Sequence, residues 1–129
     1  MGTNQHLVRS ILAIRAEGGV ALANGDRVMP DPILVGRDAG KVGALARQYG
    51  LERWTTDLHA ALANPDDELF FDAASTQLRA DLLMRAIEAG KHIYCEKPVA
   101  DSLKKALAVA RKAKAAGIKH GVVQDKLFL

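Results

Sequence analysis

The sequence of 129 residues contains a single cysteine, Cys95, so an intrachain disulfide is impossible and a cysteine-held metal cluster is not expected. It has no apolar run near the ~20 residues that cross a bilayer. It also has no charged-then-apolar leader pattern at its start. These absences predict a cytoplasmic protein of a reducing compartment that makes no membrane contact.

Motifs for several reaction classes are also missing. No Lys/Arg block is interleaved with aromatic residues, and the net charge is only +3, so we expect no nucleic-acid partner. A phosphate-binding Walker loop and a Gly-x-Ser-x-Gly elbow are absent, which argues against phosphoryl and acyl transfer. The histidines have no metal-ligand spacing, and no metal site is predicted. They are His6, His59, His92 and His120.

What the chain does have is an alternation of helical and extended patterns, which is typical of an α/β fold with a parallel sheet. Its length allows one domain with a real core. The apolar spacing and the Gly, Pro, Ser and Asp punctuation predict where the elements lie. We expect helices near residues 4–17, 39–49, 57–63, 76–89 and 102–116, and strands near residues 32–36, 54–56, 69–75, 91–95 and 119–123.

Some elements carry more specific expectations. Either Thr3 or Asn4 is expected to cap the first helix, and residues 20–31 are expected to form a loop with a turn at 24–26. Residues 32–36 are predicted to be a buried strand. The helix after Ser75 should direct four residues toward the core, with Leu83 and Ile87 adjacent. These four are Leu78, Leu82, Ala86 and Ala89.

The most informative stretch is residues 89–98, Ala-Gly-Lys-His-Ile-Tyr-Cys-Glu-Lys-Pro. A helix ends, a short apolar strand follows, and Glu96 and Lys97 stand at the carboxyl end of that strand. In an open parallel sheet this is the end at which ligands bind. Pro98 fixes the backbone directly after them. Alone, the tripeptide would be read as a solvated turn, but the flanking strand and helix favour a binding or catalytic site.

This stretch resembles the Glu-Lys-Pro motif of the Gfo/Idh/MocA oxidoreductases, the family of glucose–fructose oxidoreductase and inositol dehydrogenase. The resemblance covers residues 2–128 and is densest between 89 and 100. It implies a Rossmann-like, doubly wound parallel sheet and an NAD(P)-dependent dehydrogenase acting on a sugar, cyclitol or similar substrate. Lys97 would be the catalytic residue, hydrogen-bonding a substrate hydroxyl and favouring the developing alkoxide. Glu96 would orient Lys97 or contact the cofactor.

Further cofactor-binding candidates follow the second expected strand. An acidic residue there accepts from the ribose 2′-hydroxyl of NAD, whereas an arginine accommodates the 2′-phosphate of NADP. Gly36 is followed by Arg37, which favours NADP, but Asp38 is close enough to leave NAD open. The alternative for Arg37 is a surface side chain in a β–α turn.

Other polar residues stand at the ends of the later strands. Ser75 and Thr76 either hydrogen-bond the cofactor or cap the following helix. Gln124 and Lys126 are candidates to border the nicotinamide. Asp72, inside an apolar strand, requires a partner or faces the cleft, and the sequence does not decide between the two.

Three residues are expected to be structural. Cys95 has no base pattern beside it, and the neighbouring Glu96 raises its pKa, so a buried, unreactive thiol is the favoured interpretation. His92 and His120 are expected to be core or edge histidines with satisfied ring nitrogens.

Dinucleotide folds of this kind begin with a strand and a glycine-rich turn, but this sequence passes directly from Gly2 into a helix. We therefore expect a sheet that lacks its first strand, with Gly2 as the remaining phosphate-turn glycine. Residues 1–129 would be a partial NAD(P)-binding domain without the substrate domain that follows it in the family. Such a piece would be marginally stable or self-associating, because unpaired strand edges tend to associate.

These expectations leave two functional interpretations. The first is the cofactor-binding part of a dehydrogenase, inactive as an isolated chain and homo-oligomeric in its full-length form. The second is a non-catalytic binding module or an inactive gene fragment. A flavodoxin-like regulator is disfavoured because it does not explain residues 96–98.

Overall fold

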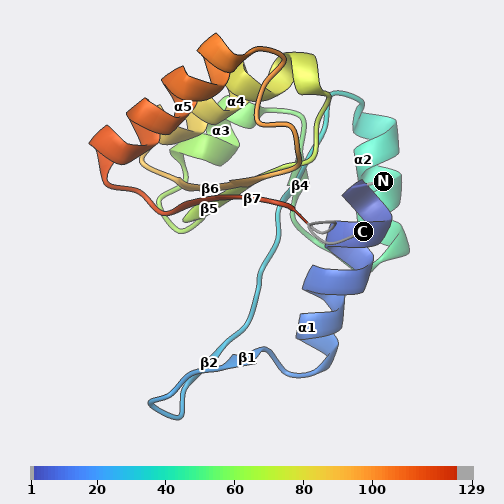
Figure 1. Ribbon diagram of the computed structural model, residues 1–129. Helices are drawn as coiled ribbons and strands as arrows, with labels where there is room; N and C mark the ends of the chain where they lie inside the picture. The colour runs from blue at the N-terminus through green and yellow to red at the C-terminus, as the bar shows by residue number, and fades with distance from the viewer. Residues whose placement is uncertain (1, 125–129) are drawn as a thin grey trace. The chain divides into compact units, whose positions relative to one another are not determined.

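The computed structural model describes residues 2–124, and Lys126 lies outside the described residues. The chain forms two compact units, Met1–Leu58 and His59–Leu129. Figure 1 shows the elements in chain order. They are η1 (Thr3–Leu12), α1 (Ala13–Ala16), β1 (Val20–Ala21), β2 (Arg27–Val28), β3 (Leu34–Val35), α2 (Ala39–Gln48), β4 (Trp54–Thr55), α3 (Leu58–Ala63), β5 (Leu69–Asp72), α4 (Thr76–Glu88), β6 (His92–Cys95), α5 (Leu103–Ala116) and β7 (His120–Val122).

The first unit starts with a continuous helical segment, as the apolar spacing predicts. Its first part, η1, is a wider π-type helix, and α1 continues it. Gly2 occupies the N-cap position, and no side chain caps this end. The predicted cap by Thr3 or Asn4 is therefore wrong. The core of this unit is formed by the buried residues Leu7, Ala46 and Leu51, against which Leu12, Leu34, Leu45 and Tyr49 pack.

Residues 20–31 were expected to be a loop, but they contain a short antiparallel hairpin of β1 and β2. The predicted turn is confirmed: Asn24 Oδ1 accepts from the Asp26 backbone N–H at 3.0 Å. The Arg27 side chain donates to the carbonyls of Gly18 and Gly19 at 2.7 and 2.8 Å. These contacts tie the hairpin to the end of the preceding helix.

The strand predicted at residues 32–36 exists but is short and is not buried. It is β3, which pairs in parallel with β4, with Leu34 opposite Trp54. Val35 is 41% exposed. Among the described residues of this unit, β3 has only β4 as a neighbour, so the expectation of a buried strand is wrong.

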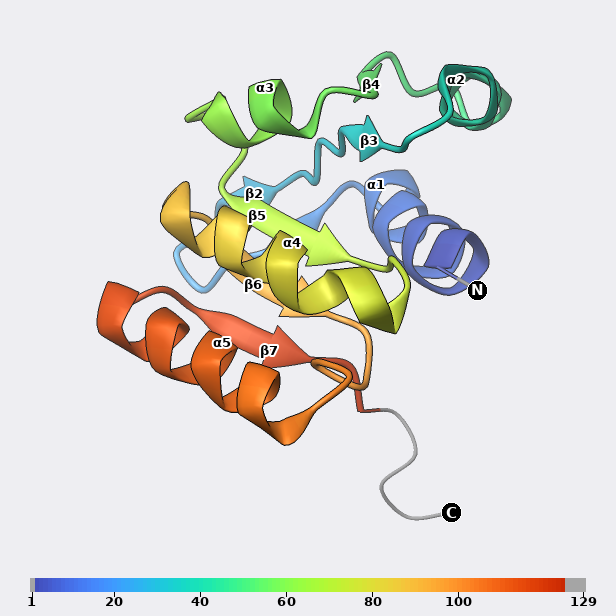
Figure 2. The same ribbon diagram turned by 90° about the horizontal axis from the view of Figure 1, so that it is seen from above.

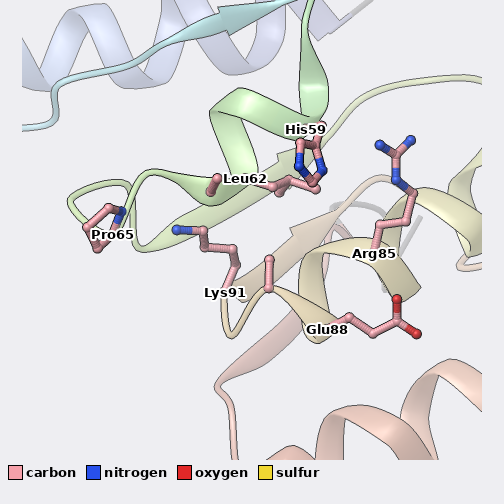
Figure 3. Close-up of a pocket in the computed structure, with 8 residues that line it drawn as sticks. His59, Leu62, Pro65, Arg85, Glu88 and Lys91 are labelled. Atoms are coloured by element: carbon pink, nitrogen blue, oxygen red, sulfur yellow. The ribbon is translucent and has the colours of Figure 1, made fainter.

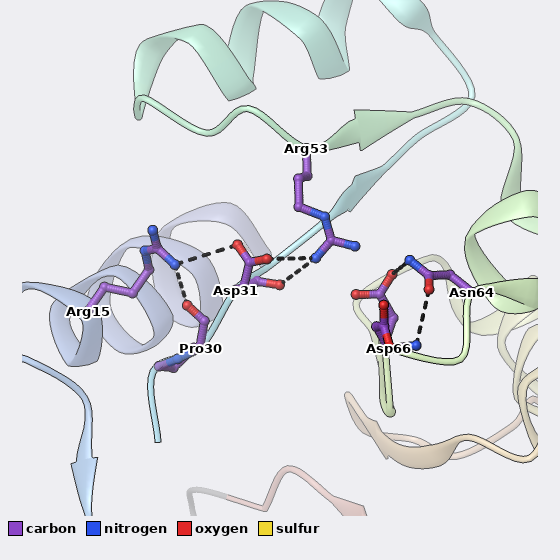
Figure 4. Close-up of polar contacts among 7 residues, drawn as sticks. Arg15, Pro30, Asp31, Arg53, Asn64 and Asp66 are labelled. Carbon is purple, nitrogen blue, oxygen red and sulfur yellow. Dashed lines mark hydrogen bonds and ion pairs between the residues drawn. The ribbon is translucent and has the colours of Figure 1, made fainter. Parts of the chain in front are cut away.

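Asp31 connects two parts of the first unit (Figure 4). Arg53 Nη1 donates to its carboxylate and to its backbone carbonyl, both at 3.0 Å. Arg15 pairs with the same carboxylate at 3.7 Å and also donates to the Pro30 carbonyl. Because Asp31 is largely exposed, these ion pairs contribute more to the path of the chain than to stability.

The second unit contains a parallel sheet in the order β5-β6-β7, with α4 and α5 side by side on one face (Figure 2). Each helix forms the crossover between neighbouring parallel strands, which is the arrangement that parallel pairing requires. Asp72 stands opposite Cys95, and Cys95 stands opposite Val122. The predicted α/β class with parallel strands is confirmed.

The face that α4 buries differs from the expected one. Leu78 is 40% exposed and Ala89 is also exposed, so the prediction that both point to the core is wrong. The buried stripe instead begins one residue later with Arg79 and continues through Ala80, Leu83, Ala86 and Ile87. This spacing is still one helical face. It is rotated because Arg79 occupies an interior position.

The predicted helix ends are confirmed. Gly90 and Gly117 adopt φ values of +76° and +67°, in the left-handed region that glycine tolerates best. Ser102 caps α5 by accepting from the Lys105 backbone N–H. These local signals fix where α4 and α5 begin or end.

Replacing Leu83 by alanine tests the core of the second unit. Leu83 is fully buried, and the truncation would leave a cavity beneath α4. We expect the free energy of unfolding, measured by urea denaturation, to fall by about 3 kcal/mol. Leu103→Ala is the matched control, because Leu103 is 74% exposed, and it should change stability little. Equal effects of the two substitutions would contradict this assignment of the core.

Candidate functional site

The candidate site lies at the carboxyl ends of the strands in the second unit's sheet, which we call the carboxyl edge of the sheet. The Glu96 backbone N–H donates to the Asp72 carbonyl at 2.9 Å, so the segments after β5 and β6 leave the sheet side by side. The Val123 N–H donates to the Cys95 carbonyl at 2.8 Å, which places the segment after β7 next to them. The predicted site residues of this unit therefore share one edge. They are Ser75, Thr76, Glu96, Lys97 and Gln124.

Glu96 and Lys97 follow β6 directly. Lys97 is exposed, and within residues 2–124 its ammonium has no hydrogen bond or ion pair. Glu96 is half-buried, and its Oε2 accepts from the Lys97 backbone N–H at 3.1 Å. The Lys97–Pro98 peptide bond is cis. The edge of the sheet thus presents a cation that can contact a small molecule, next to a carboxylate that is held in place.

A buried ion pair lies directly behind this edge. Arg79 and Asp72 are 3% and 2% exposed, and Arg79 Nε donates to Asp72 Oδ2 at 2.5 Å. Arg79 Nη1 donates to the Pro98 carbonyl at 2.5 Å, and Nη2 donates to the Ala74 carbonyl at 2.6 Å. Of the two alternatives left open for Asp72, the structure shows the one with a partner. We call Asp72, Arg79 and the carbonyls of Ala74 and Pro98 the Arg79 latch.

Arg79 was not a candidate in the sequence analysis. The available signal was the Asp72 carboxylate in an apolar strand, followed seven residues later by a cation in the first turn of a helix. A buried charge requires a partner, so the nearest arginine in the helix that follows was a candidate for this role.

Ser75 occupies the N-cap position of α4 with an extended backbone, but its side chain makes no capping hydrogen bond. The interpretation of Ser75 as a side-chain cap is therefore wrong. Thr76, the first residue of α4, is half-buried. Both residues lie at the amino end of a helix, where backbone N–H groups and the helix dipole favour negative charge.

The remaining predicted residues belong to the first unit. Gly36 follows β3, and a Cβ atom there would stand 3.3 Å from Val42 Cβ, so the glycine permits close packing of α2. Asp38 is the N-cap of α2, and its Oδ1 accepts from the Lys41 N–H at 3.0 Å. Arg37 is exposed, and within the described residues its guanidinium has no partner. Gly2 has a helical backbone at the start of η1.

A cavity of about 440 Å³ lies at the amino ends of the strands of the same sheet, beside the start of β6 (Figure 3). Its lining includes His59, Arg85, Glu88 and Lys91. Lys91 is buried, and its Nζ donates to the Asn64 carbonyl at 2.5 Å just after α3. Glu88 pairs with Lys112. These contacts give Lys91 and Glu88 structural roles. The cavity is separate from the candidate site.

The residues expected to be structural behave largely as predicted. Cys95 is 1% exposed, and its burial raises the pKa of the thiol; Arg79 opposes this shift, while Asp72 and Glu96 add to it. The predicted direction is confirmed, although burial rather than Glu96 is the main cause. His92 Nδ1 accepts from the Lys119 backbone N–H at 3.1 Å, as expected for a satisfied histidine. His120 is exposed at the start of β7, an outer strand in the order β5-β6-β7, so it is an edge histidine and not a core histidine.

Parallel strands with helical crossovers and polar residues at their carboxyl ends define an α/β protein of the nucleotide-binding type. The model of the Gfo/Idh/MocA oxidoreductase family, with its NAD-binding Rossmann fold, matches residues 32–123. The chain belongs to this family, and the resemblance stated from residues 89–98 is confirmed.

Relatives and solved structures agree. The chain is 48% identical over 129 residues to a D-xylose dehydrogenase of Paenarthrobacter nicotinovorans, covering 100% of this chain and 33% of the relative. It is 32% identical to a scyllo-inositol 2-dehydrogenase (NAD(+)) of Bacillus subtilis, covering 61% of this chain and 23% of the relative. A levoglucosan dehydrogenase in complex with NADH and levoglucosan is similar in structure, with a TM-score of 0.69 and 30% identity over 74% of this chain and 26% of that chain.

The chain thus spans about a third of the length of the D-xylose dehydrogenase and less of the other two proteins. Within residues 2–124, none of the helices has the length and hydrophobicity needed to span a bilayer.

The raised pKa of Cys95 has a chemical consequence that can be measured. Since the thiolate is the reactive form, a raised pKa lowers its fraction at neutral pH, and burial restricts access to it. We expect iodoacetamide to alkylate the folded chain far more slowly than the urea-unfolded chain, with the rate rising at higher pH than for a free cysteine. Equal rates in the two states would contradict this assignment.

Proposed function

We propose that residues 1–129 form the nicotinamide-dinucleotide-binding part of a dehydrogenase that acts on a sugar, cyclitol or similar hydroxyl-bearing substrate. The observation that carries the proposal is the Lys97 ammonium, which is exposed and unpaired among the described residues, at the carboxyl edge of a parallel sheet in a chain of this family. Ligands of open α/β sheets bind at this edge. The similarity to D-xylose, scyllo-inositol and levoglucosan dehydrogenases supports a polyhydroxylated substrate.

The residues at this edge fit a dinucleotide. Ala73 and Ala74 are small, so a ligand can approach the backbone after β5, and the Ser75 hydroxyl is not used in a cap. A bound nicotinamide would supply the hydride acceptor. Lys97 would hydrogen-bond the substrate hydroxyl and stabilise the negative charge that develops on its oxygen. Glu96 would hold the backbone of Lys97 through its contact with the amide.

We propose NADP as the preferred dinucleotide. Arg37 is exposed after β3 and can bind a 2′-phosphate. Asp38, the competing candidate for the ribose hydroxyls of NAD, uses one carboxylate oxygen to cap α2. NAD is the alternative, because the similar levoglucosan dehydrogenase structure contains NADH.

Titration of the chain with NADPH and NADH tests this proposal. We expect NADPH to bind more tightly, and Arg37→Ser to weaken NADPH binding about tenfold while leaving NADH within about twofold, because a charge-assisted bond to phosphate is lost. Arg47→Ser, at an exposed position in the last turn of α2, is the matched control and should change neither affinity.

Two outcomes would contradict these assignments. If neither nucleotide binds at millimolar concentration, the chain does not act as a cofactor-binding unit. If Arg37→Ser weakens NADH and NADPH binding equally, the arginine does not read the 2′-phosphate.

We further propose that the substrate-binding domain of the enzyme lies outside residues 1–129, together with the remaining acid–base groups. We expect the full-length enzyme to be homo-oligomeric. The chain alone should then bind nucleotide without turnover. With D-xylose or scyllo-inositol and either oxidised nucleotide, the absorbance of reduced nicotinamide should stay at background. Sustained formation of reduced nicotinamide by the chain alone would contradict this division of the enzyme.

A further inference from the structure

We propose that Arg79 is a positioning residue, whose guanidinium holds the segments after β5 and β6 in the geometry that nucleotide binding requires. The inference rests on the proposed function and adds to it a residue outside the Glu96-Lys97-Pro98 motif. Arg79 itself is 3% exposed and lies behind the edge, so it acts through the backbone on which the binding residues stand.

The guanidinium uses its three nitrogens in three directions. Nε donates to the carboxylate of Asp72, which is the last residue of β5. Nη2 donates to the Ala74 carbonyl, and Nη1 donates to the Pro98 carbonyl. The planar, rigid fork of arginine fixes these directions relative to one another. One side chain on α4 thereby joins two segments that belong to different β–α crossovers.

The two carbonyls adjoin the candidate binding residues. The Ala74 carbonyl belongs to the peptide unit that leads into Ser75, and Pro98 directly follows Lys97. A shift of either carbonyl would therefore move a side chain that the proposed function assigns to the ligand. Both carbonyls accept from the same guanidinium.

Stability alone does not account for this arrangement. A buried ion pair often contributes no more to folding than two well-packed apolar residues of similar size. Apolar side chains at positions 72 and 79 would fill the same space, but they would leave the two carbonyls without their shared donor. What the pair adds is the fixed position of the segments, and a preorganised site binds more tightly than a mobile one.

Two variants distinguish the effect of Arg79 on the position of the two segments from its effect on the stability of the fold. Arg79→Lys keeps a cation beside Asp72 but lacks the fork, so it balances the charge without reaching both carbonyls. The double variant Asp72→Leu with Arg79→Met removes both charges and therefore leaves no buried ion unpaired. Leu83→Ala, on the same helix, is the control for a loss of stability that removes none of the hydrogen bonds of Arg79.

The measurements are NADPH titration below the melting temperature of each variant, urea unfolding, and amide NMR spectra of residues 73–76 and 96–101. We expect the double variant to unfold as a cooperative domain, yet both latch variants should bind NADPH at least about tenfold more weakly, a loss of about 1.4 kcal/mol. Their amide changes should concentrate in these two segments. Leu83→Ala should be less stable but keep the parent affinity.

If Arg79→Lys restores both stability and affinity to the parent level, the arginine only balances the charge of Asp72 and the proposal is overturned. Parent-like affinity in the double variant would also overturn it. Should the parent chain bind neither NADPH nor NADH, the proposed function fails, and the amide spectra still decide whether Arg79 holds the two segments. Spectra of both variants that match the parent in residues 73–76 and 96–101 would then reject the latch.

Discussion

The second unit depends on one constraint: a carboxylate at the end of β5 is buried and must have a cation beside it. Asp72 is 2% exposed, and Arg79 provides its partner from the first turn of α4. Because the cost of an unpaired buried charge is high, this contact fixes how α4 is rotated on the sheet. The same guanidinium then donates to carbonyls on both sides of the candidate site. Core packing and site geometry are thus coupled through one side chain.

The charged residues of the two units fall into two groups, those that are buried and those that are exposed. Charges that face the protein interior are paired, as in Asp72 with Arg79, and Lys91 is buried with its ammonium on a backbone carbonyl. Lys97 and Arg37, in contrast, are exposed and without a partner among residues 2–124. Exposed cations at the ends of parallel strands are available to an anionic dinucleotide or to a substrate oxygen. This contrast, together with family membership, supports a cofactor-binding role.

Local signals predicted much of the fold because their physics is local. The helix ends at Gly90 and Gly117, where φ is positive, and the cap by Ser102 were predicted correctly. Each of these features depends on only a few residues that are neighbours in sequence. The wrong predictions concern burial, which depends on contacts with residues that are distant in sequence. The apolar run at residues 32–36 predicted a strand but could not show how few neighbours β3 has in its unit. Helical spacing in α4 predicted an apolar stripe, but the buried pair set its rotation and left Leu78 exposed.

From its sequence alone, the chain is an α/β protein with Glu96 and Lys97 at the carboxyl end of a strand, and residues 89–98 indicate its family. These properties follow from the order of residues along one strand and its flanking helices. Only the tertiary structure showed that Asp38 caps a helix, that Ser75 does not, and that Arg79 holds Asp72, Ala74 and Pro98 together. The carbonyl of Pro98 is 19 residues from Arg79 in sequence. Parallel pairing of β5 and β6 brings them together, and no pattern within a single element encodes that contact.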